Sequence, residues 1–208
     1  AFALESLIDE IAEKLGMDAL DLRLKNIVDE GDEGPTGQKL SGVGLREALT
    51  RAAEAIGWGK DPGPNRGKGI AVSWWTTTGG SSGVFVKLNP DGTVMLKTGA
   101  VEIGTGAVMA GAAQILAETL GVDLEDIIVS EADTGSSPFD FGAQGSRTTV
   151  AVGRACMQAG QELRRQILET ASEMLEVPIE ALELRDKTVC VEDAPHIRKT
   201  LAEIASYS

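Results

Sequence analysis

The chain has 208 residues and a formal net charge of −13, with 42% hydrophobic and 25% charged residues. This is the composition of a globular protein with a buried core, and the negative charge argues against a nucleic-acid partner. Because no apolar run approaches the roughly 18 residues of a membrane helix and no leader pattern opens the chain, we expect a cytoplasmic protein without membrane contact.

Residues 1–66 have the pattern of a helical segment. Apolar residues at helical spacing predict three helices, over residues 1–15, 19–28 and 43–56. Gly16 should end the first helix, Asp18 should cap the second, and 29–38 should form a charged loop. Because the first helix opens at Ala1 without a capping residue, we expect a longer protein whose preceding part this segment joins.

Residues 67–208 change character and should form an α+β subdomain. Strands are predicted over residues 70–78, 83–89, 93–99 and 126–132. Two of them flank the turn residues Asn89 to Gly92 and should pair as a hairpin over 83–99. Helices are predicted over residues 106–120, 149–174 and 200–206, with a small hairpin over 183–193. The expected fold class is therefore α+β, with a mixed sheet, a β-hairpin and long helices.

The first candidate binding loop is the pentapeptide Glu102-Ile103-Gly104-Thr105-Gly106, between a predicted strand and a predicted helix. Glycines let the backbone approach a ligand closely, and the N–H groups at a helix start favour an anion such as phosphate. A tight turn with nothing bound would have the same pattern.

The second candidate loop, residues 142–149, also precedes a predicted helix. It contains three hydroxyl side chains, those of Ser146, Thr148 and Thr149. Hydroxyls and backbone N–H groups suit phosphate or pterin heteroatoms, and Gly145 should allow close approach of the backbone to such a ligand. Arg147 could neutralise a phosphate or pair with Asp140 or Asp133. A capped helix start with a structural salt bridge is the alternative.

Three stretches of the chain carry a family resemblance: 3–32 (ALESLIDEIAEKLGMDALDLRLKNIVDEGD), 81–106 (SSGVFVKLNPDGTVMLKTGAVEIGTG) and 116–155 (LAETLGVDLEDIIVSEADTGSSPFDFGAQGSRTTVAVGRA). In this order they resemble the molybdopterin-binding subunit of the xanthine dehydrogenase, aldehyde oxidase and carbon monoxide dehydrogenase family of molybdenum hydroxylases. The resemblance covers about residues 1–185. It implies an oxidoreductase that hydroxylates an aldehyde, an N-heteroaromatic or a related substrate.

The resemblance also implies cofactors and partners. The molybdenum would be held by the dithiolene of molybdopterin, in bacterial members usually the cytosine dinucleotide form. FAD and two [2Fe–2S] clusters would belong to partner modules, and the rest of the molybdopterin subunit would complete the site. We expect the chain alone to hold no cofactor and to be inactive, and either to self-associate or to have a mobile N-terminal segment over residues 1–66. The alternatives are a naturally split subunit that needs another chain, and a non-catalytic domain that keeps the fold.

Site residues follow from the resemblance position by position. The expected cofactor contacts are Ile103, Gly104, Thr105, Gly106, Ala143, Gln144, Gly145, Ser146, Arg147 and Thr148. Thr105 departs from the glutamine most common in the family, and Val72, Ser73 and Trp74 are candidates for the border of the substrate pocket. The family's catalytic glutamate lies in a GxGE-like segment that this sequence lacks. We therefore assign no catalytic residue, and we expect Glu102 to support its loop.

Two cysteines and one histidine complete the list of reactive side chains. Cys156 and Cys190 lack the spacing of metal ligands. We expect both to be reduced thiols buried in the fold. His196 has no neighbours in sequence that would suit a zinc site or a Ser/His/Asp triad.

Overall fold

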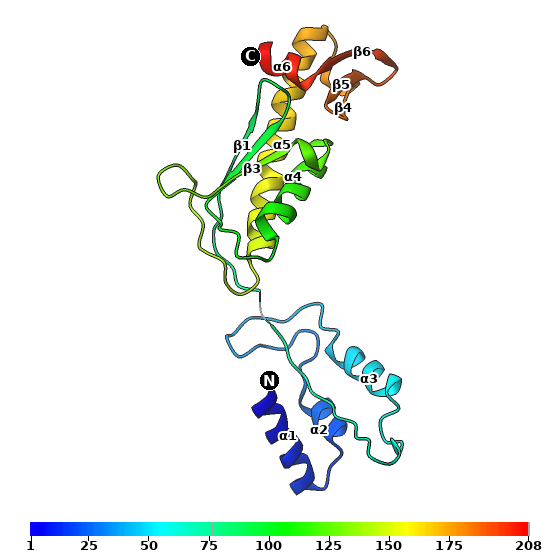
Figure 1. Cartoon of the computed structure of the whole chain (residues 1–208). Helices are drawn as coiled ribbons and strands as arrows, with labels where there is room; N and C mark the ends of the chain where they lie inside the picture. The colour runs from blue at the N-terminus through cyan, green and yellow to red at the C-terminus, as the bar shows by residue number, and fades with distance from the viewer. Residues whose placement is uncertain (76, 208) are drawn as a thin grey trace. The chain divides into compact units, whose positions relative to one another are not determined.

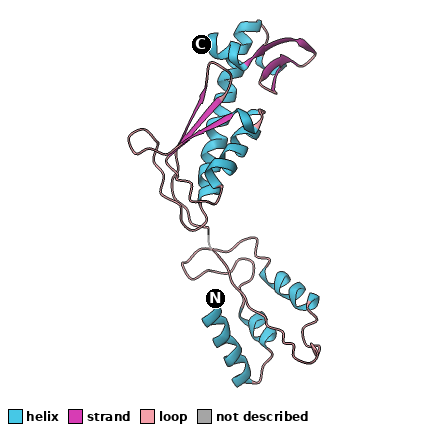
Figure 2. Cartoon of the chain, in the orientation of Figure 1, coloured by secondary structure: helices cyan, strands magenta, loops and turns pink. Residues whose placement is uncertain are grey.

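The computed structural model describes residues 1–75 and 77–207. The chain divides into two compact units, Ala1–Trp75 and Thr76–Ser208, each with secondary structure of its own (Figures 1 and 2). Helices and two small sheets occur together, so the predicted α+β class is confirmed. In the part of the chain that the structure describes, no helix is both long and apolar enough to cross a membrane.

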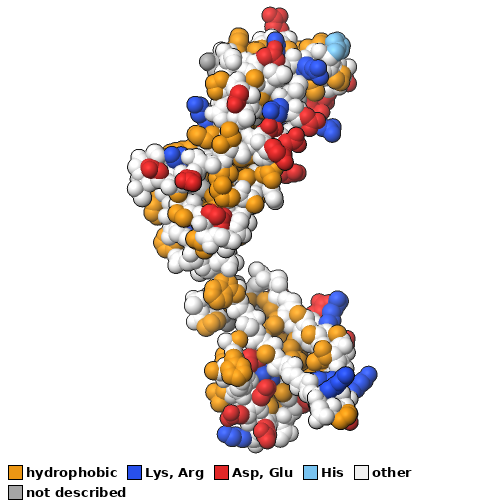
Figure 3. Space-filling view, in the orientation of Figure 1, with side chains coloured by type: hydrophobic (Ala, Val, Ile, Leu, Met, Phe, Trp, Pro, Cys, Tyr) orange, Lys and Arg blue, Asp and Glu red, His pale blue; other side chains and the backbone are white. Residues whose placement is uncertain are grey.

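The first unit contains three helices. They are α1 (Phe2–Leu15), α2 (Ala19–Asn26) and α3 (Leu45–Ala55). Gly16, with a left-handed φ of 61°, ends α1, and the Asp18 carboxylate caps α2 by accepting the N–H of Leu20 over 2.8 Å. Several apolar side chains of α1 are exposed at the surface, where hydrophobic side chains are visible in this unit (Figure 3): Phe2 is 88% exposed and Leu15 is 63% exposed.

A buried ion pair joins the first two helices of this unit. Arg23 Nε donates to Glu5 Oε2 over 2.9 Å, and the same carboxylate oxygen accepts the N–H of Val72 over 2.8 Å. The strand predicted over 70–78 is wrong for its described residues, which belong to no strand. The backbone N–H of Val72, within this segment, is bonded to the Glu5 carboxylate and not to a neighbouring strand. Thr76, within that prediction, lies outside the described residues.

The second unit is built on a three-stranded sheet. Its strands are β1 (Val84–Leu88), β2 (Val94–Thr98) and β3 (Ile127–Ser130). β1 and β2 form the predicted antiparallel hairpin, and β2 pairs with β3 in parallel. The helices α4 (Ala113–Leu120) and α5 (Thr148–Leu175) pack on the sheet, and η1 (Ala107–Ala112) packs against both of these helices. The core between sheet and helices includes Val94, Leu96, Leu116 and Val152, each fully buried.

The helix predicted over 106–120 has two parts in the structure. Its first part, η1, is a π-helix, and only α4 is a regular α-helix. Such single π-turns occur often at functional sites. On α5, Cys156 is fully buried, and burial raises the pKa of its thiol to about 11.

A second sheet closes the far end of α5. Its strands are β4 (Leu182–Arg185), β5 (Thr188–Val191) and β6 (Ala194–Thr200). The helix α6 (Leu201–Tyr207) follows β6 directly. Two further single turns are η2 (Leu124–Asp126) and η3 (Ile179–Ala181). The hairpin of β4 and β5 was predicted, whereas β6 was not. Its sequence carries Pro195 and charged residues, which hide the alternation expected of a strand.

Candidate cofactor-binding site

A cavity of about 390 Å³ lies in the second unit between the two glycine-rich segments. We call residues 102–106 the first loop and residues 142–149 the second loop. The lining residues are Ile103, Thr105, Ala107, Ala143, Gln144, Gly145, Ser146, Thr148 and Thr149. Seven of these are residues that the sequence predicted, and the structure brings them to one place. Thr149 had been named as part of the second candidate loop but not among the expected cofactor contacts, and only Ala107, next to Gly106, was missed.

Sheet topology explains why the two loops meet. The first loop follows β2 and the second loop follows β3, after an irregular stretch. Because β2 and β3 are parallel neighbours, with Lys97 opposite Ser130, their carboxyl ends lie at one edge of the sheet. In open sheets such an edge is the usual place for a ligand. The two loops are thus adjacent in space although Glu102 and Gly142 lie 40 positions apart in the chain.

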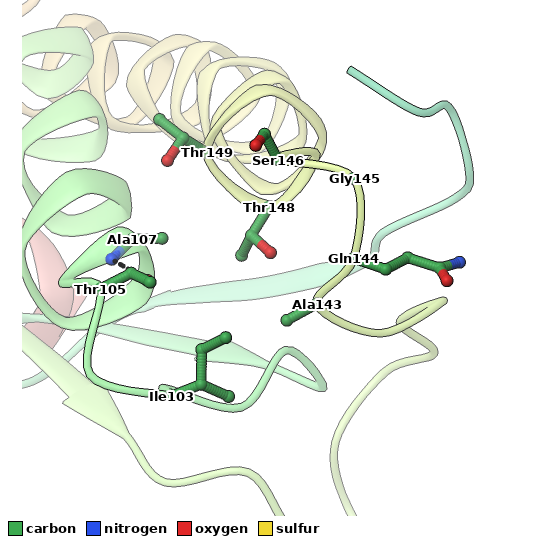
Figure 4. Close-up of a pocket in the computed structure, with 9 residues that line it drawn as sticks. All are labelled: Ile103, Thr105, Ala107, Ala143, Gln144, Gly145, Ser146, Thr148 and Thr149. Atoms are coloured by element: carbon green, nitrogen blue, oxygen red, sulfur yellow. Dashed lines mark hydrogen bonds between the residues drawn. The ribbon is translucent and has the colours of Figure 1, made fainter. Parts of the chain in front are cut away.

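Side-chain directions divide the cavity residues into two groups. Figure 4 shows Ile103, Ala143 and Thr148 directed toward the space between the loops, whereas Gln144 points away from the others. Thr105 uses its hydroxyl oxygen locally, accepting the N–H of Ala107 over 3.4 Å. The wall of the first loop is therefore largely apolar, and that of the second loop carries hydroxyls.

Glu102 occupies the amide groups of the first loop. Its Oε1 atom accepts the N–H of Gly104 over 2.8 Å and that of Gly106 over 2.9 Å. Its Oε2 atom accepts the N–H of Val108 over 3.2 Å and that of Met109 over 3.5 Å. These bonds, with that from Gly106 the largest contribution, lower the pKa of Glu102 to about 2. Gly104 and Gly106, predicted as cofactor contacts, do not line the cavity.

Arg147 also lies behind the cavity wall. Its side chain is 1% exposed and approaches Asp140, itself 2% exposed, with an Nη1 to Oδ1 distance of 3.4 Å. Three carbonyl oxygens of residues 79–81 and that of Gly142 accept further bonds from the guanidinium, at 2.9 to 3.1 Å. A guanidinium has five N–H donors, and these acceptors together with Ser82 Oγ engage all of them.

The predicted border of the substrate pocket falls in the other unit. Val72, Ser73 and Trp74 belong to Ala1–Trp75, whereas every residue that lines the cavity belongs to Thr76–Ser208. Val72 is half-buried, and its N–H is bonded to Glu5. A role for these three residues near a substrate stays a prediction.

Comparison with known proteins identifies the family. Residues 42–208 match the family described as "Molybdopterin cofactor-binding domain". The chain is 35% identical over 188 residues to the xanthine dehydrogenase molybdenum-binding subunit of Escherichia coli O157:H7, covering 84% of this chain and 25% of that protein. The chain belongs to the molybdopterin cofactor-binding domain family of the molybdenum hydroxylases. It spans about a quarter of the length of this relative.

Solved structures agree with this assignment. The Cu,Mo-CO dehydrogenase is 25% identical, with a TM-score of 0.70 over 98% of this chain and 29% of that chain. Aldehyde oxidoreductase from Desulfovibrio desulfuricans is 30% identical, with a TM-score of 0.59 over 82% of this chain and 20% of that chain. Quinoline 2-oxidoreductase from Pseudomonas putida 86 shows the same fold: it is 23% identical, with a TM-score of 0.68 over 98% of this chain and 29% of that chain.

Proposed function

We propose that the cavity between the first and second loops binds part of a molybdopterin cofactor. The domain would do so within a larger oxidoreductase that hydroxylates an aldehyde, an N-heteroaromatic or a related substrate. The observation that carries this proposal is the meeting of the two loops in one cavity, lined by seven of the ten predicted contacts. When bound, the cofactor would supply the redox chemistry, and the neutral side chains of the lining would bind and orient it.

The lining suits a polar, phosphate-bearing ligand. Its polar side chains are neutral, and hydroxyls of Ser146, Thr148 and Thr149 can donate to phosphate or pterin oxygens. The N-terminal turn of α5, a helix of 28 residues, begins at Thr148 and adds backbone N–H groups and a favourable dipole. Within residues 1–75 and 77–207, no group of three or more His, Cys, Asp or Glu side chains could hold a metal. The neutral polar lining of the cavity fits a cofactor that brings the metal ligands with it.

The rest of the assembly follows from the family resemblance and is part of the proposal. The cofactor would have the cytosine dinucleotide form, and FAD and [2Fe–2S] clusters would be carried by partner modules. Other parts of the larger protein would complete the enclosure of the ligand. The 208-residue chain alone would therefore hold no molybdenum and be inactive. Self-association through exposed apolar residues such as those of α1 would follow.

A bulky side chain in the cavity tests the proposal. Ala143 is exposed and directed into the cavity, so Ala143→Trp should exclude the cofactor and leave the protein folded. In the full-length enzyme we expect molybdenum and pterin content to fall at least about tenfold in Ala143→Trp, the effect of losing about 1.4 kcal/mol of binding or more. Ala143→Ser, which adds one small polar atom, should keep the wild-type content. Full occupancy in Ala143→Trp would refute the proposal.

A further inference from the structure

The first loop carries an anion of its own, the Glu102 carboxylate. We propose that Glu102 is a positioning residue, which holds the first loop in the conformation that faces the cavity by occupying the loop's inward-pointing amides. The hydrogen bonds between Glu102 and these amides form within the chain and involve no ligand. The consequence for the cofactor rests on the proposed function of the cavity.

The hydrogen bonds show what the carboxylate does. Both oxygens are used: one binds the N–H groups of Gly104 and Gly106, and the other those of Val108 and Met109. The first N–H groups of a helix have no partner within it and attract negative charge. Glu102 supplies that charge to the start of η1 from four residues before Gly106. Its pKa of about 2 agrees with a carboxylate that is stabilised by these amides.

The two glycines of the loop are required by backbone conformation. Gly104 has a φ of +96° and Gly106 a φ of +74°, a region that residues with a Cβ rarely adopt. A Cβ at Gly104 would meet no atom within 4 Å, and one at Gly106 would meet only Ala110 at 3.9 Å. Space is therefore available at both positions. The glycines serve to turn the amides toward Glu102.

This arrangement decides what the first loop can offer a ligand. With its inward amides engaged by Glu102, the loop has no cluster of free N–H groups for a phosphate. The loop presents Ile103 and Thr105 to the cavity, and Ala107 at the start of η1 lies beside them. Anionic groups of the cofactor would then be bound by the second loop and the start of α5, where no carboxylate lines the cavity.

Amide hydrogen exchange and chemical rescue test the role of Glu102. In the 208-residue chain, Glu102→Ala should raise the exchange rates of the Gly106 and Val108 amides about tenfold or more, because each loses a charge-assisted bond. Excess acetate should restore the slow exchange in Glu102→Ala by placing a carboxylate back among the amides. The same acetate should not alter the wild-type protein. Glu118→Gln, at an exposed position of α4, is the matched control and should exchange like wild type.

A pH series separates a positioning role from a general loss of stability. Glu102 has a lowered pKa in the folded state, so its contribution exists above the unfolded value near 4.5 and disappears as pH falls toward about 2. The difference in exchange between wild type and Glu102→Gln should therefore shrink over that range. Equal exchange in wild type and Glu102→Ala at neutral pH, or no response of the variant to acetate, would overturn the proposal.

The two proposals fail in different experiments. The exchange measurement uses protein without cofactor, so it reports on Glu102 whether or not the cavity binds molybdopterin. A normal molybdenum content in Ala143→Trp would refute the cavity assignment and leave the Glu102 result intact. Wild-type exchange in Glu102→Ala would refute the positioning role and leave the cavity assignment standing.

Discussion

Gly145 lies directly against Thr78. A Cβ added at Gly145 would come within 2.3 Å of Thr78 Oγ1 and 2.4 Å of its Cγ2 atom, and the Thr78 N–H donates to the Gly145 carbonyl over 2.9 Å. Gly145 also has a positive φ of 52°. The sequence suggested that this glycine lets a ligand approach. The structure gives it a different partner, because the space that a side chain would need is filled by another segment of the chain.

The first prediction concerns this contact. Gly145→Ala should destabilise the domain by about 2 to 4 kcal/mol. Alanine is unfavourable at the left-handed φ of this position, and its Cβ would also clash with Thr78. Thr78→Gly removes the clashing atoms and should restore part of the loss, with a coupling energy of about 1 to 3 kcal/mol in a double-mutant cycle. Chemical denaturation of the four proteins measures this. Additive effects would show that Thr78 is not what excludes a side chain at Gly145.

Much of the fold was accessible from the sequence. Helical periodicity located α1 and α5, and the turn residues Asn89 to Gly92 located the hairpin of β1 and β2. These signals are local, since each element is specified by residues close in the chain. The predicted strand over 70–78 failed because its β-branched and aromatic residues were judged without the partner of Val72, which is a carboxylate 67 positions away.

Most residues that line the cavity were predicted from the sequence, whereas the contacts of Arg147 behind the cavity wall were not. Glycine-rich loops at helix starts are visible in sequence, and the family resemblance placed both of them. Four of the partners of Arg147 lie 65 to 68 positions earlier in the chain, at residues 79–82. Sequence offered Asp140 as one partner and left a phosphate as the alternative. Only the structure shows that all donors of the guanidinium are engaged.

The second prediction follows from the burial of Arg147. Arg147→Ala would leave Asp140 buried without its countercharge and several carbonyl oxygens without donors, so we expect a loss of about 3 to 5 kcal/mol in stability. Arg147→Lys keeps the charge but has too few donors in one plane to replace the guanidinium, and should recover only part of the loss. Arg165→Ala, which breaks only exposed pairs on α5, is the control and should melt like wild type. A wild-type melting temperature for Arg147→Ala would contradict this account.

The third prediction compares two glycines on the buried side of α5. A Cβ at Gly160 would lie 2.9 Å from Thr119 Cγ2 and 3.0 Å from Leu116 Cδ1. Thr119 is fixed by its own bond to the Ile115 carbonyl over 2.7 Å, so Gly160→Ala should cost about 1 to 3 kcal/mol.

Gly153 provides the matched comparison. Its Cβ would come close only to the end of the flexible Ile115 side chain, at 2.6 Å. Rotation of that side chain can relieve the contact, and alanine favours a helix by about 1 kcal/mol over glycine. Gly153→Ala should therefore be neutral or slightly stabilising in denaturation experiments. Equal losses at both positions would show that α4 and α5 tolerate no added atom anywhere along their contact.

The fourth prediction uses the opposite directions of two neighbouring side chains. Thr148 is half-buried and directed into the cavity, whereas Gln144 is exposed and points away from it. If Thr148 donates to the cofactor, Thr148→Val keeps its shape but loses the hydroxyl and about 1 kcal/mol of binding, which corresponds to roughly fivefold weaker retention. Gln144→Ala should retain the cofactor like wild type, although family position alone predicts a contact for both residues.

Molybdenum release from the full-length enzyme under mild heating measures the difference. The melting temperature of the cofactor-free variants is measured alongside, and the comparison holds for variants that melt like the wild-type protein. Faster release from Gln144→Ala than from Thr148→Val would show that the bound cofactor lies on the outer side of the second loop and not in the cavity.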